Sequence, residues 1–122
     1  MREFLKDGKA NFVDNNDVLV GFDNSGNCCE NFGWAYTETL PIENSKLNGG
    51  PGTPPVKLDA FNFDPNFFQA TQDSGQDSSV AIFRLTHSGN DLYLCLYNSH
   101  NGYYSHGFHM EVGGNKIRDG SL

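Results

Sequence analysis

The sequence predicts an all-β protein, an antiparallel sandwich or partly open barrel of about six or seven strands with one short helix at most. Aromatic residues make up 13% of the chain and glycines number 14, a composition typical of strands joined by turns. Several short runs alternate apolar and polar residues, and turn signals separate them. At 122 residues we expect a single domain, residues 1–122.

The first third of the chain predicts a β-hairpin. Residues 1–9 fit either a short helix or a leading strand, and Gly8 ends it in both cases. Apolar residues alternate in 17–23, as they do in a strand with one buried face. The turn signal at 24–27 and a second alternating run at 28–38 complete the strand–turn–strand pattern.

The middle of the chain predicts one strand between two polar loops. Residues 44–55 are rich in Gly and Pro, which favours a long irregular loop, and 71–79 predict a second loop. We expect both loops to be mobile. Residues 56–64 read as a strand, and 65–69 as a turn or a short 3₁₀ segment.

The last third predicts a contiguous three-stranded meander formed by residues 80–87, 91–98 and 102–112. A two-residue turn at 89–90 and a loop at 98–102 set the two registers. Both registers place the same apolar residues on one face, which we expect to be the core. This face comprises Phe83, Leu85, Leu92, Leu94, Leu96, Tyr104, His106, Phe108, Met110 and Val112.

The opposite face of the same strands is aromatic and polar. It carries Ile82, Arg84, Thr86, Tyr93, Cys95, Tyr97, Tyr103, Ser105 and His109. Either the acidic N-terminal strands cover this face, or it is a binding surface. In the second case Tyr97, His100, Tyr103 and His109 form an aromatic recognition surface on the hairpin, because Tyr and His side chains give rigid amphipathic contacts.

Charge is unevenly distributed along the chain. The net charge is −7, and residues 10–83 hold ten acidic side chains and two basic ones, so that segment carries −8. An acidic surface disfavours direct binding to nucleic acid, which requires Lys and Arg to neutralise phosphates. It permits a protein partner with a basic surface. The acidic residues expected to meet such a partner are Asp14, Asp17, Asp23, Glu30 and Glu38.

Cysteine content and hydropathy indicate the compartment. Three cysteines, two of them adjacent at Cys28 and Cys29, do not form a framework of disulfides typical of secreted domains. Residues 1–12 lack the apolar core of a signal peptide, and no window approaches 18 apolar residues. We expect a protein of the reducing cytoplasm, the host-cell cytoplasm if a phage encodes it, with no membrane association.

A metal site is a weak alternative. The candidate ligands are His106, His109, Cys28 and Cys29, but they do not have the spacing of paired zinc ligands. Strand alternation puts the two histidines on opposite faces, unless the strand bulges at Gly107. We therefore predict no bound metal and no cofactor. Oxygen-rich turns near the N-terminus lack the calcium-loop pattern, and nucleotide-binding glycine motifs are missing from the sequence.

Catalytic patterns are equally weak. Cys95 lies in the middle of a predicted strand, where a nucleophile is seldom accessible. An acid–base pair of His87 with His100 or His109, with Arg84 on a phosphate, has the residue types of a ribonuclease or phosphodiesterase. The negative charge disfavours such a polyanionic substrate. No serine-nucleophile elbow is present in the sequence.

Two motifs are similar to a known group of proteins. "NCCENFGW" (27–34) and "LYNSHNGYYSHGF" (96–108), followed by the C-terminal "GGNKIRDGSL", resemble a family of small uncharacterised domains of bacteria and their phages. That family shares a Cys-Cys-Glu motif and a C-terminal His-Asn-Gly-Tyr-Tyr-x-His-Gly-Phe motif. The resemblance implies a phage or prophage context, in which small acidic proteins often bind a host or defence protein.

Two functions from different classes fit these observations. The first is a non-enzymatic acidic binding protein, for example a phage-encoded anti-defence inhibitor of a host defence or nucleic-acid-handling protein. The second is a small hydrolase, either metal-dependent or based on His and Cys. The first is the preferred prediction, because the sequence has an acidic asymmetry and no catalytic spacing.

Overall fold

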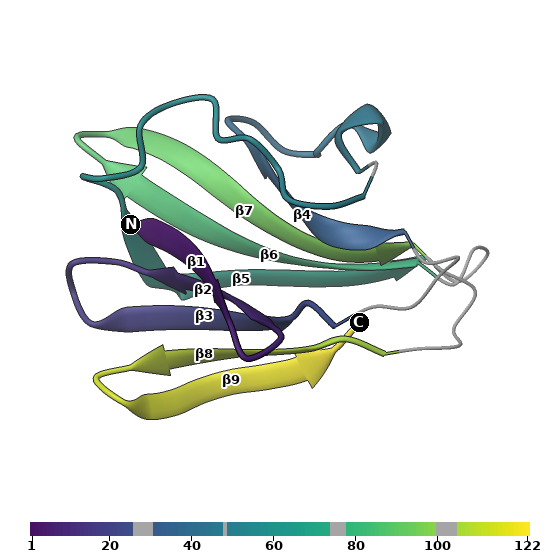
Figure 1. The fold of residues 1–122 in the computed structure, drawn as a ribbon. Helices are drawn as coiled ribbons and strands as arrows, with labels where there is room; N and C mark the ends of the chain where they lie inside the picture. Colours follow the sequence, from purple (N-terminus) through teal and green to yellow (C-terminus); the bar gives the residue numbers. More distant parts are fainter. Residues whose placement is uncertain (26–30, 48, 74–77, 100–104) are drawn as a thin grey trace.

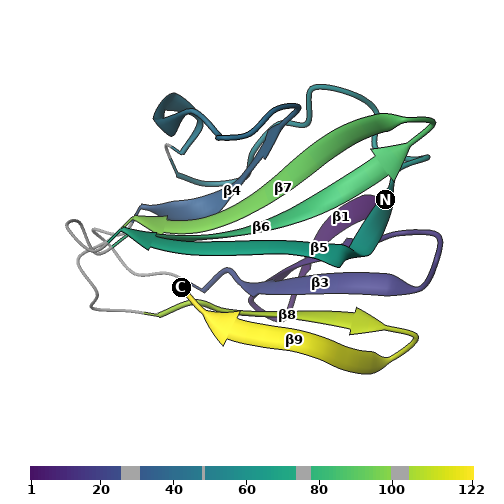
Figure 2. The ribbon, with the colours of Figure 1, turned by 180° about the vertical axis from the view of Figure 1, so that it is seen from behind.

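A computed structural model describes residues 1–25, 31–47, 49–73, 78–99 and 105–122. Its described residues form nine strands in two antiparallel sheets stacked face to face (Figures 1 and 2). The strands are β1 (Arg2–Lys6), β2 (Lys9–Val13), β3 (Val18–Asp23), β4 (Phe32–Thr37), β5 (Asn62–Asp73), β6 (Ser78–His87), β7 (Asn90–Ser99), β8 (Gly107–Val112) and β9 (Asn115–Ser121). A short 3₁₀ helix, η1, spans Asn44–Lys46.

One sheet has five strands in the order β1-β2-β3-β8-β9, and the other has four in the order β4-β7-β6-β5. The prediction of an all-β antiparallel sandwich is confirmed, and the two sheets do not close into a barrel. In the four-stranded sheet, β5, β6 and β7 are neighbours in sequence and in space. β4 lies beside β7, and the long segment 38–61 connects β4 to β5 at the other edge of the sheet, which is a Greek-key arrangement. Among the described residues, no helix has the length and the apolar character needed to cross a lipid bilayer.

The first nine residues form strand rather than helix. Asp7 and Gly8 both have positive φ, 56° and 74°, and Lys6 pairs with Lys9 across them. This is a two-residue hairpin turn in which both central residues have positive φ, as in type I′. The strand after the turn, β2, was not predicted, and neither was β9. β9 is rich in polar residues, so its alternation is weak, whereas β2 alternates over only five residues, which is a short run to recognise.

The predicted hairpin between residues 17–23 and 28–38 is wrong. β3 pairs with β2 and β8 in one sheet, whereas β4 pairs with β7 in the other. The chain therefore changes sheet between β3 and β4. Alternation reports which side of a strand is buried, and the two sheets of a sandwich bury facing sides. The pattern is thus the same for a hairpin and for a crossover.

The predicted C-terminal meander is half right. β6 and β7 form a hairpin, but β8 lies in the other sheet, between β3 and β9. The β6–β7 turn is Ser88–Gly89, with positive φ at both residues, so the register differs by two residues from that of the predicted turn at 89–90. A shift of two residues keeps each side chain on its predicted face.

Strand β5 corrects the middle of the prediction. It begins at Asn62, close to the end of the predicted strand 56–64, and it runs to Asp73. The first residues of the predicted loop 71–79 therefore belong to β5 and its last residues to β6. Residues 74–77 lie outside the described residues. A register shift between Phe63 and Phe68 accommodates Pro65, which has no N–H to donate to the neighbouring strand.

The core lies between the two sheets. All predicted core residues that the structure describes face it. Phe83, Leu85, Leu94, Leu96 and Met110 are fully buried, and Val112 packs against the cluster as a partly buried residue. Tyr104 lies outside the described residues. The five-stranded sheet contributes Phe12, Val20 and Phe22 from β2 and β3, and β4 of the four-stranded sheet contributes Trp34 and Tyr36.

Part of the outer face of the four-stranded sheet, around Cys95 and Tyr97, is covered by a segment that was expected to be a mobile loop. The Gly49 N–H donates to the Tyr97 hydroxyl over 2.6 Å, and Gly50 forms a parallel bridge with Gly33 of β4. Tyr97 and Cys95 are consequently buried. The cover is therefore the segment around η1, and not the acidic N-terminal strands.

Candidate functional site

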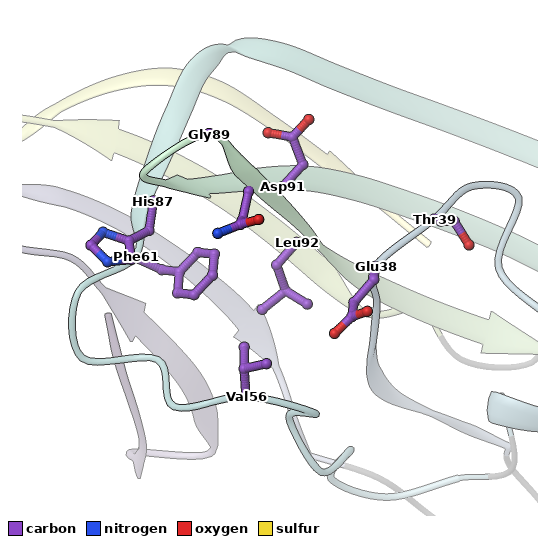
Figure 3. A pocket seen from close by; sticks show the side chains of 9 residues that line it. Glu38, Thr39, Val56, Phe61, His87, Gly89, Asp91 and Leu92 are labelled. Atoms are coloured by element: carbon purple, nitrogen blue, oxygen red, sulfur yellow. The ribbon is translucent and has the colours of Figure 1, made fainter.

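The 14–17, 88–89 and 113–114 turns lie at one end of the sandwich, which we call the turn end (Figure 1). A cavity of about 690 Å³ lies at this end, and Figure 3 shows the residues that line it. Three segments that are distant in sequence form it: the end of β4, the segment before β5, and the β6–β7 turn. The lining residues are Glu38, Thr39, Val56, Phe61, His87, Gly89, Asn90, Asp91 and Leu92. Its volume falls in the range of small-ligand sites.

The floor of this turn-end cavity is apolar. Leu92 and Phe61 belong to the core cluster, and Val56 is one of the few large apolar side chains exposed to solvent, at 41%. The Phe61 ring packs against the His87 ring with centroids 5.6 Å apart. A ligand in the cavity would therefore cover apolar surface that water now contacts.

The rim of the cavity is polar and acidic. Glu38, Thr39 and Asp91 are exposed, and no lysine or arginine occurs among the described residues of the lining. Figure 3 shows the Glu38 carboxylate turned toward Val56 and Leu92, whereas the Asp91 carboxylate points away from them. Glu38 therefore places a negative charge beside an apolar floor.

Buried and partly buried hydrogen bonds hold the segments that form the cavity. The Met1 ammonium donates to the carbonyl oxygens of Leu58 and Phe61, over 2.5 and 2.9 Å, which fixes the turn before β5. The Thr37 hydroxyl donates to the Thr39 carbonyl over 2.8 Å and shapes the backbone at Glu38. Such bonds restrict the freedom of the loops, so the cavity is largely pre-formed.

Asp14 does not belong to an exposed acidic face, contrary to the prediction. It is only 7% exposed, and its Oδ1 accepts hydrogen bonds from the N–H groups of Asn16 and Val18, each at 2.9 Å. Its Oδ2 accepts from the Phe63 N–H at 2.8 Å. Asp14 therefore joins the β2–β3 turn to β5 and is not available to a partner.

The other predicted acidic residues do not form one surface. Asp17 is exposed in the β2–β3 turn, and Asp23 lies at the opposite end of β3, where its carboxylate accepts from Ser25. Glu38 lies at the turn end in the cavity described above. Glu30 lies outside the described residues.

The predicted aromatic surface is also divided. Tyr97 is 1% exposed, and burial raises the pKa of its hydroxyl, so it is not part of a recognition surface. His109 lies on the outer side of the five-stranded sheet, paired with Gly21 of β3, and burial lowers its pKa. His100 and Tyr103 lie outside the described residues.

The candidate metal ligands do not converge in the part of the chain that is described. His106 is 1% exposed, stacks on Phe32 with centroids 4.0 Å apart, and places its Nδ1 2.9 Å from the Asp23 carbonyl oxygen. It is the core histidine that its apolar row suggested. Among the described residues, no group of three His, Cys, Asp or Glu side chains is placed to hold a metal ion. Cys28 and Cys29 lie outside them.

The described residues of the catalytic alternatives are not arranged as those alternatives require. Cys95 is fully buried, and burial raises the pKa of its thiol to about 12, so the nucleophilic thiolate is scarce at neutral pH. His87 is at the turn end, whereas His109 is on the other sheet. Arg84, the proposed phosphate ligand, is paired with Asp64 at 2.5 Å.

Sequence reasoning selected Glu38 for its charge alone and missed the cavity around it. Val56, Phe61 and Leu92 come from different segments, and no local pattern brings them together. One local signal was available: His87 and Asp91 flank the turn between two confidently predicted strands, so a hairpin places them near each other.

Comparison of the chain with models of protein families, with curated protein sequences and with solved structures found no significant match. The fold and the site therefore define the protein as an antiparallel β-sandwich with an acidic-rimmed, apolar-floored cavity at one end. The resemblance to small domains of bacteria and phages stays a prediction.

Proposed function

We propose that the chain is a non-enzymatic binding protein that recognises a basic surface of a partner protein, and that a lysine or arginine side chain of the partner enters the turn-end cavity. One observation carries this proposal: the Glu38 carboxylate faces the apolar floor formed by Val56 and Leu92 (Figure 3). Lysine and arginine have an apolar stem and a cationic head, which match the floor and the rim respectively.

Magnitudes support a contribution from both parts of the side chain. Each methylene group removed from water contributes about 0.8 kcal/mol, and an exposed ion pair contributes about 0.2–1 kcal/mol. A single side chain thus binds weakly, in the millimolar range. Useful affinity requires the surrounding partner surface, and the exposed acidic residue Asp91 on the rim favours a basic one.

A phage-encoded inhibitor of a host defence or nucleic-acid-handling protein is the biological setting that we favour. Proteins that bind nucleic acid present basic grooves. A small protein with a net charge of −7 has the charge needed to occupy such a groove.

The first experiment tests the cavity alone. We expect N-acetyl-arginine amide to produce saturable shifts of the Gly89 and Leu92 amide signals in ¹⁵N NMR spectra, and N-acetyl-norleucine amide, which lacks the charge, to bind more weakly. Glu38→Gln should weaken arginine binding about threefold or more, by loss of one ion pair. Asp17→Asn is the matched control, because it removes one negative charge at the same end without altering the lining.

The second experiment tests the partner. Tagged wild-type protein, Glu38→Gln and Asp17→Asn are used to capture proteins from host-cell lysate at low and moderate salt, with identification by mass spectrometry. We expect one basic protein that is captured by wild type and Asp17→Asn, released by salt and captured in smaller amount by Glu38→Gln. A partner that Glu38→Gln captures as well as wild type does, or arginine amide shifts that Glu38→Gln leaves unchanged, would refute the proposed site.

A further inference from the structure

Strand β1 leaves one edge of the five-stranded sheet open (Figure 1). Lys6 and Lys9 flank the two-residue turn and therefore exchange hydrogen bonds, and the bonded pairs then alternate along an antiparallel ladder. It follows that Glu3 and Leu5 direct their backbone N–H and C=O groups away from β2. In the described part of the chain β1 pairs with β2 alone, so this edge offers donors and acceptors to an added strand.

A groove follows this open edge. Two hollows share Glu3: one, of about 670 Å³, lies between Met1–Glu3 and the segment 54–59, and the other, of about 210 Å³, is bounded by Leu5, Trp34 and Pro51. The proline-rich segment thus forms a wall beside β1. Leu5 is 64% exposed. The groove therefore has the apolar surface that inward-pointing side chains of an extended peptide require.

The outer side of the same hairpin is basic, in a protein that is acidic overall. Arg2, Phe4 and Lys6 alternate with the groove-facing residues of β1, and Lys6 lies directly opposite Lys9 of β2. Two like charges in directly opposed positions repel each other. On its other side Lys9 lies opposite Asp23 of β3, whereas Arg2 and Lys6 of β1 have no strand beyond them in the described residues. A negative side chain on a strand added to β1 would therefore face these two cations.

We propose that β1 binds an extended segment of another protein by β-strand addition, and that this segment alternates acidic residues on its outer side with apolar residues that enter the groove. Backbone hydrogen bonds at Glu3 and Leu5 provide affinity, and the basic outer side selects an acidic sequence. The groove adjoins the turn-end cavity at Val56, which lines both. The inference is nevertheless separate from the proposed function, because it uses the backbone of β1 and a partner of opposite charge.

A second copy of the chain does not fit this edge. An antiparallel β1–β1 pair centred on Phe4 would place Arg2 of one copy opposite Lys6 of the other, on both sides of the centre. Like charges directly opposite each other destabilise strand pairs. Charged residues on edge strands commonly prevent such self-association. Here the charged residues are basic, so a partner strand with acidic side chains is compatible with this edge.

The test uses the chain's single tryptophan as a reporter. The Trp34 indole N–H donates to Glu3 over 3.2 Å, so binding at Glu3 should change its fluorescence. The probe is the peptide acetyl-Glu-Val-Glu-Val-Glu-Val-Glu-amide, and the same peptide with Lys in place of Glu is the charge control. We expect saturable binding of the acidic peptide and none of the basic peptide at about 1 mM.

Three variants locate the binding. Leu5→Pro removes a free-edge N–H without removing a β1–β2 hydrogen bond, and it should raise the Kd about fivefold or more. Leu5→Ala keeps the N–H and controls for the loss of the side chain, so it should bind more tightly than Leu5→Pro. The double variant Arg2→Glu, Lys6→Glu should raise the Kd about tenfold. Circular dichroism and thermal melting check that each variant is folded.

Several results would overturn the inference. They are the absence of a saturable Trp34 signal, equal binding of both peptides, and an unchanged Kd in folded Leu5→Pro or in the charge-reversed variant. Sedimentation velocity provides the remaining test, since a wild-type dimer that Leu5→Pro abolishes would assign the edge to a second copy of the chain.

Discussion

Replacing Asp14 with alanine should destabilise the fold more than most substitutions of an acidic residue. Its carboxylate accepts three backbone hydrogen bonds at 2.8–2.9 Å, and the bonds to Val18 and Phe63 are buried. A hydrogen bond to a charged group contributes about 1.5–3 kcal/mol to stability, and a buried donor left without a partner lowers stability by about 1–3 kcal/mol. Because the three bonds share one side chain and do not add fully, we expect a loss of about 3–5 kcal/mol.

The measurement is urea and thermal unfolding followed by Trp34 fluorescence. With about 2.1 cal/mol/K of unfolding entropy per residue, a loss of 3 kcal/mol lowers the Tm of a chain of this length by about 12 °C. In Asp14→Asn the side-chain oxygen can still accept from the N–H groups of the turn, but the side-chain NH₂ group then faces the Phe63 N–H, and two donors cannot form a hydrogen bond. This variant should therefore lose about 1–3 kcal/mol of stability. Asp17→Asn, in the same turn, should change stability by less than about 0.5 kcal/mol. A loss below about 1 kcal/mol in Asp14→Ala would refute the reasoning.

Three further outcomes are expected. A hydrogen bond from Arg84 lowers the pKa of Asp64 below its ordinary value of 3.8, so its stabilisation is complete above that value and is lost as the pH falls through the folded-state pKa. The stability difference between wild type and Asp64→Asn should shrink between about pH 5 and pH 2, and a constant difference in urea unfolding would contradict this. Gly21→Ala places a Cβ against the His109 ring and should destabilise the protein by about 1–3 kcal/mol, with partial recovery in the double variant with His109→Ala. In a background where the other two cysteines are serine, Cys95 should react with a thiol reagent only as fast as the protein unfolds, because its side chain is buried. Rapid labelling of the folded protein would contradict this expectation.

The sequence supports the fold class and the core better than the pairing of strands. In β6 and β7 the strict alternation identifies Phe83, Leu85, Leu94 and Leu96 as core residues, and this holds although the turn is displaced. Alternation carries no information about which strand lies next to which. For that reason the crossovers after β3 and after β7 were read as hairpins.

The candidate site was less predictable because its residues meet only in the folded chain. Glu38 follows β4, Phe61 precedes β5 and Leu92 begins β7. Asp14 illustrates the opposite error. A carboxylate beside Asn15 and Asn16 resembles a solvent-exposed turn, and its burial depends on the approach of the Phe63 N–H from β5, which no local pattern indicates.

The position of β8 between β3 and β9 has a consequence for how the chain folds. Val18 pairs with Val112, so the five-stranded sheet joins the two ends of the sequence. Loop-closure entropy opposes such long-range pairing until much of the native structure is present, and β-sandwiches of this kind fold in milliseconds to seconds. During synthesis β3 must wait for the last strands with one edge unpaired. The hairpin of β6 and β7, whose contacts are local, is the natural place for folding to begin.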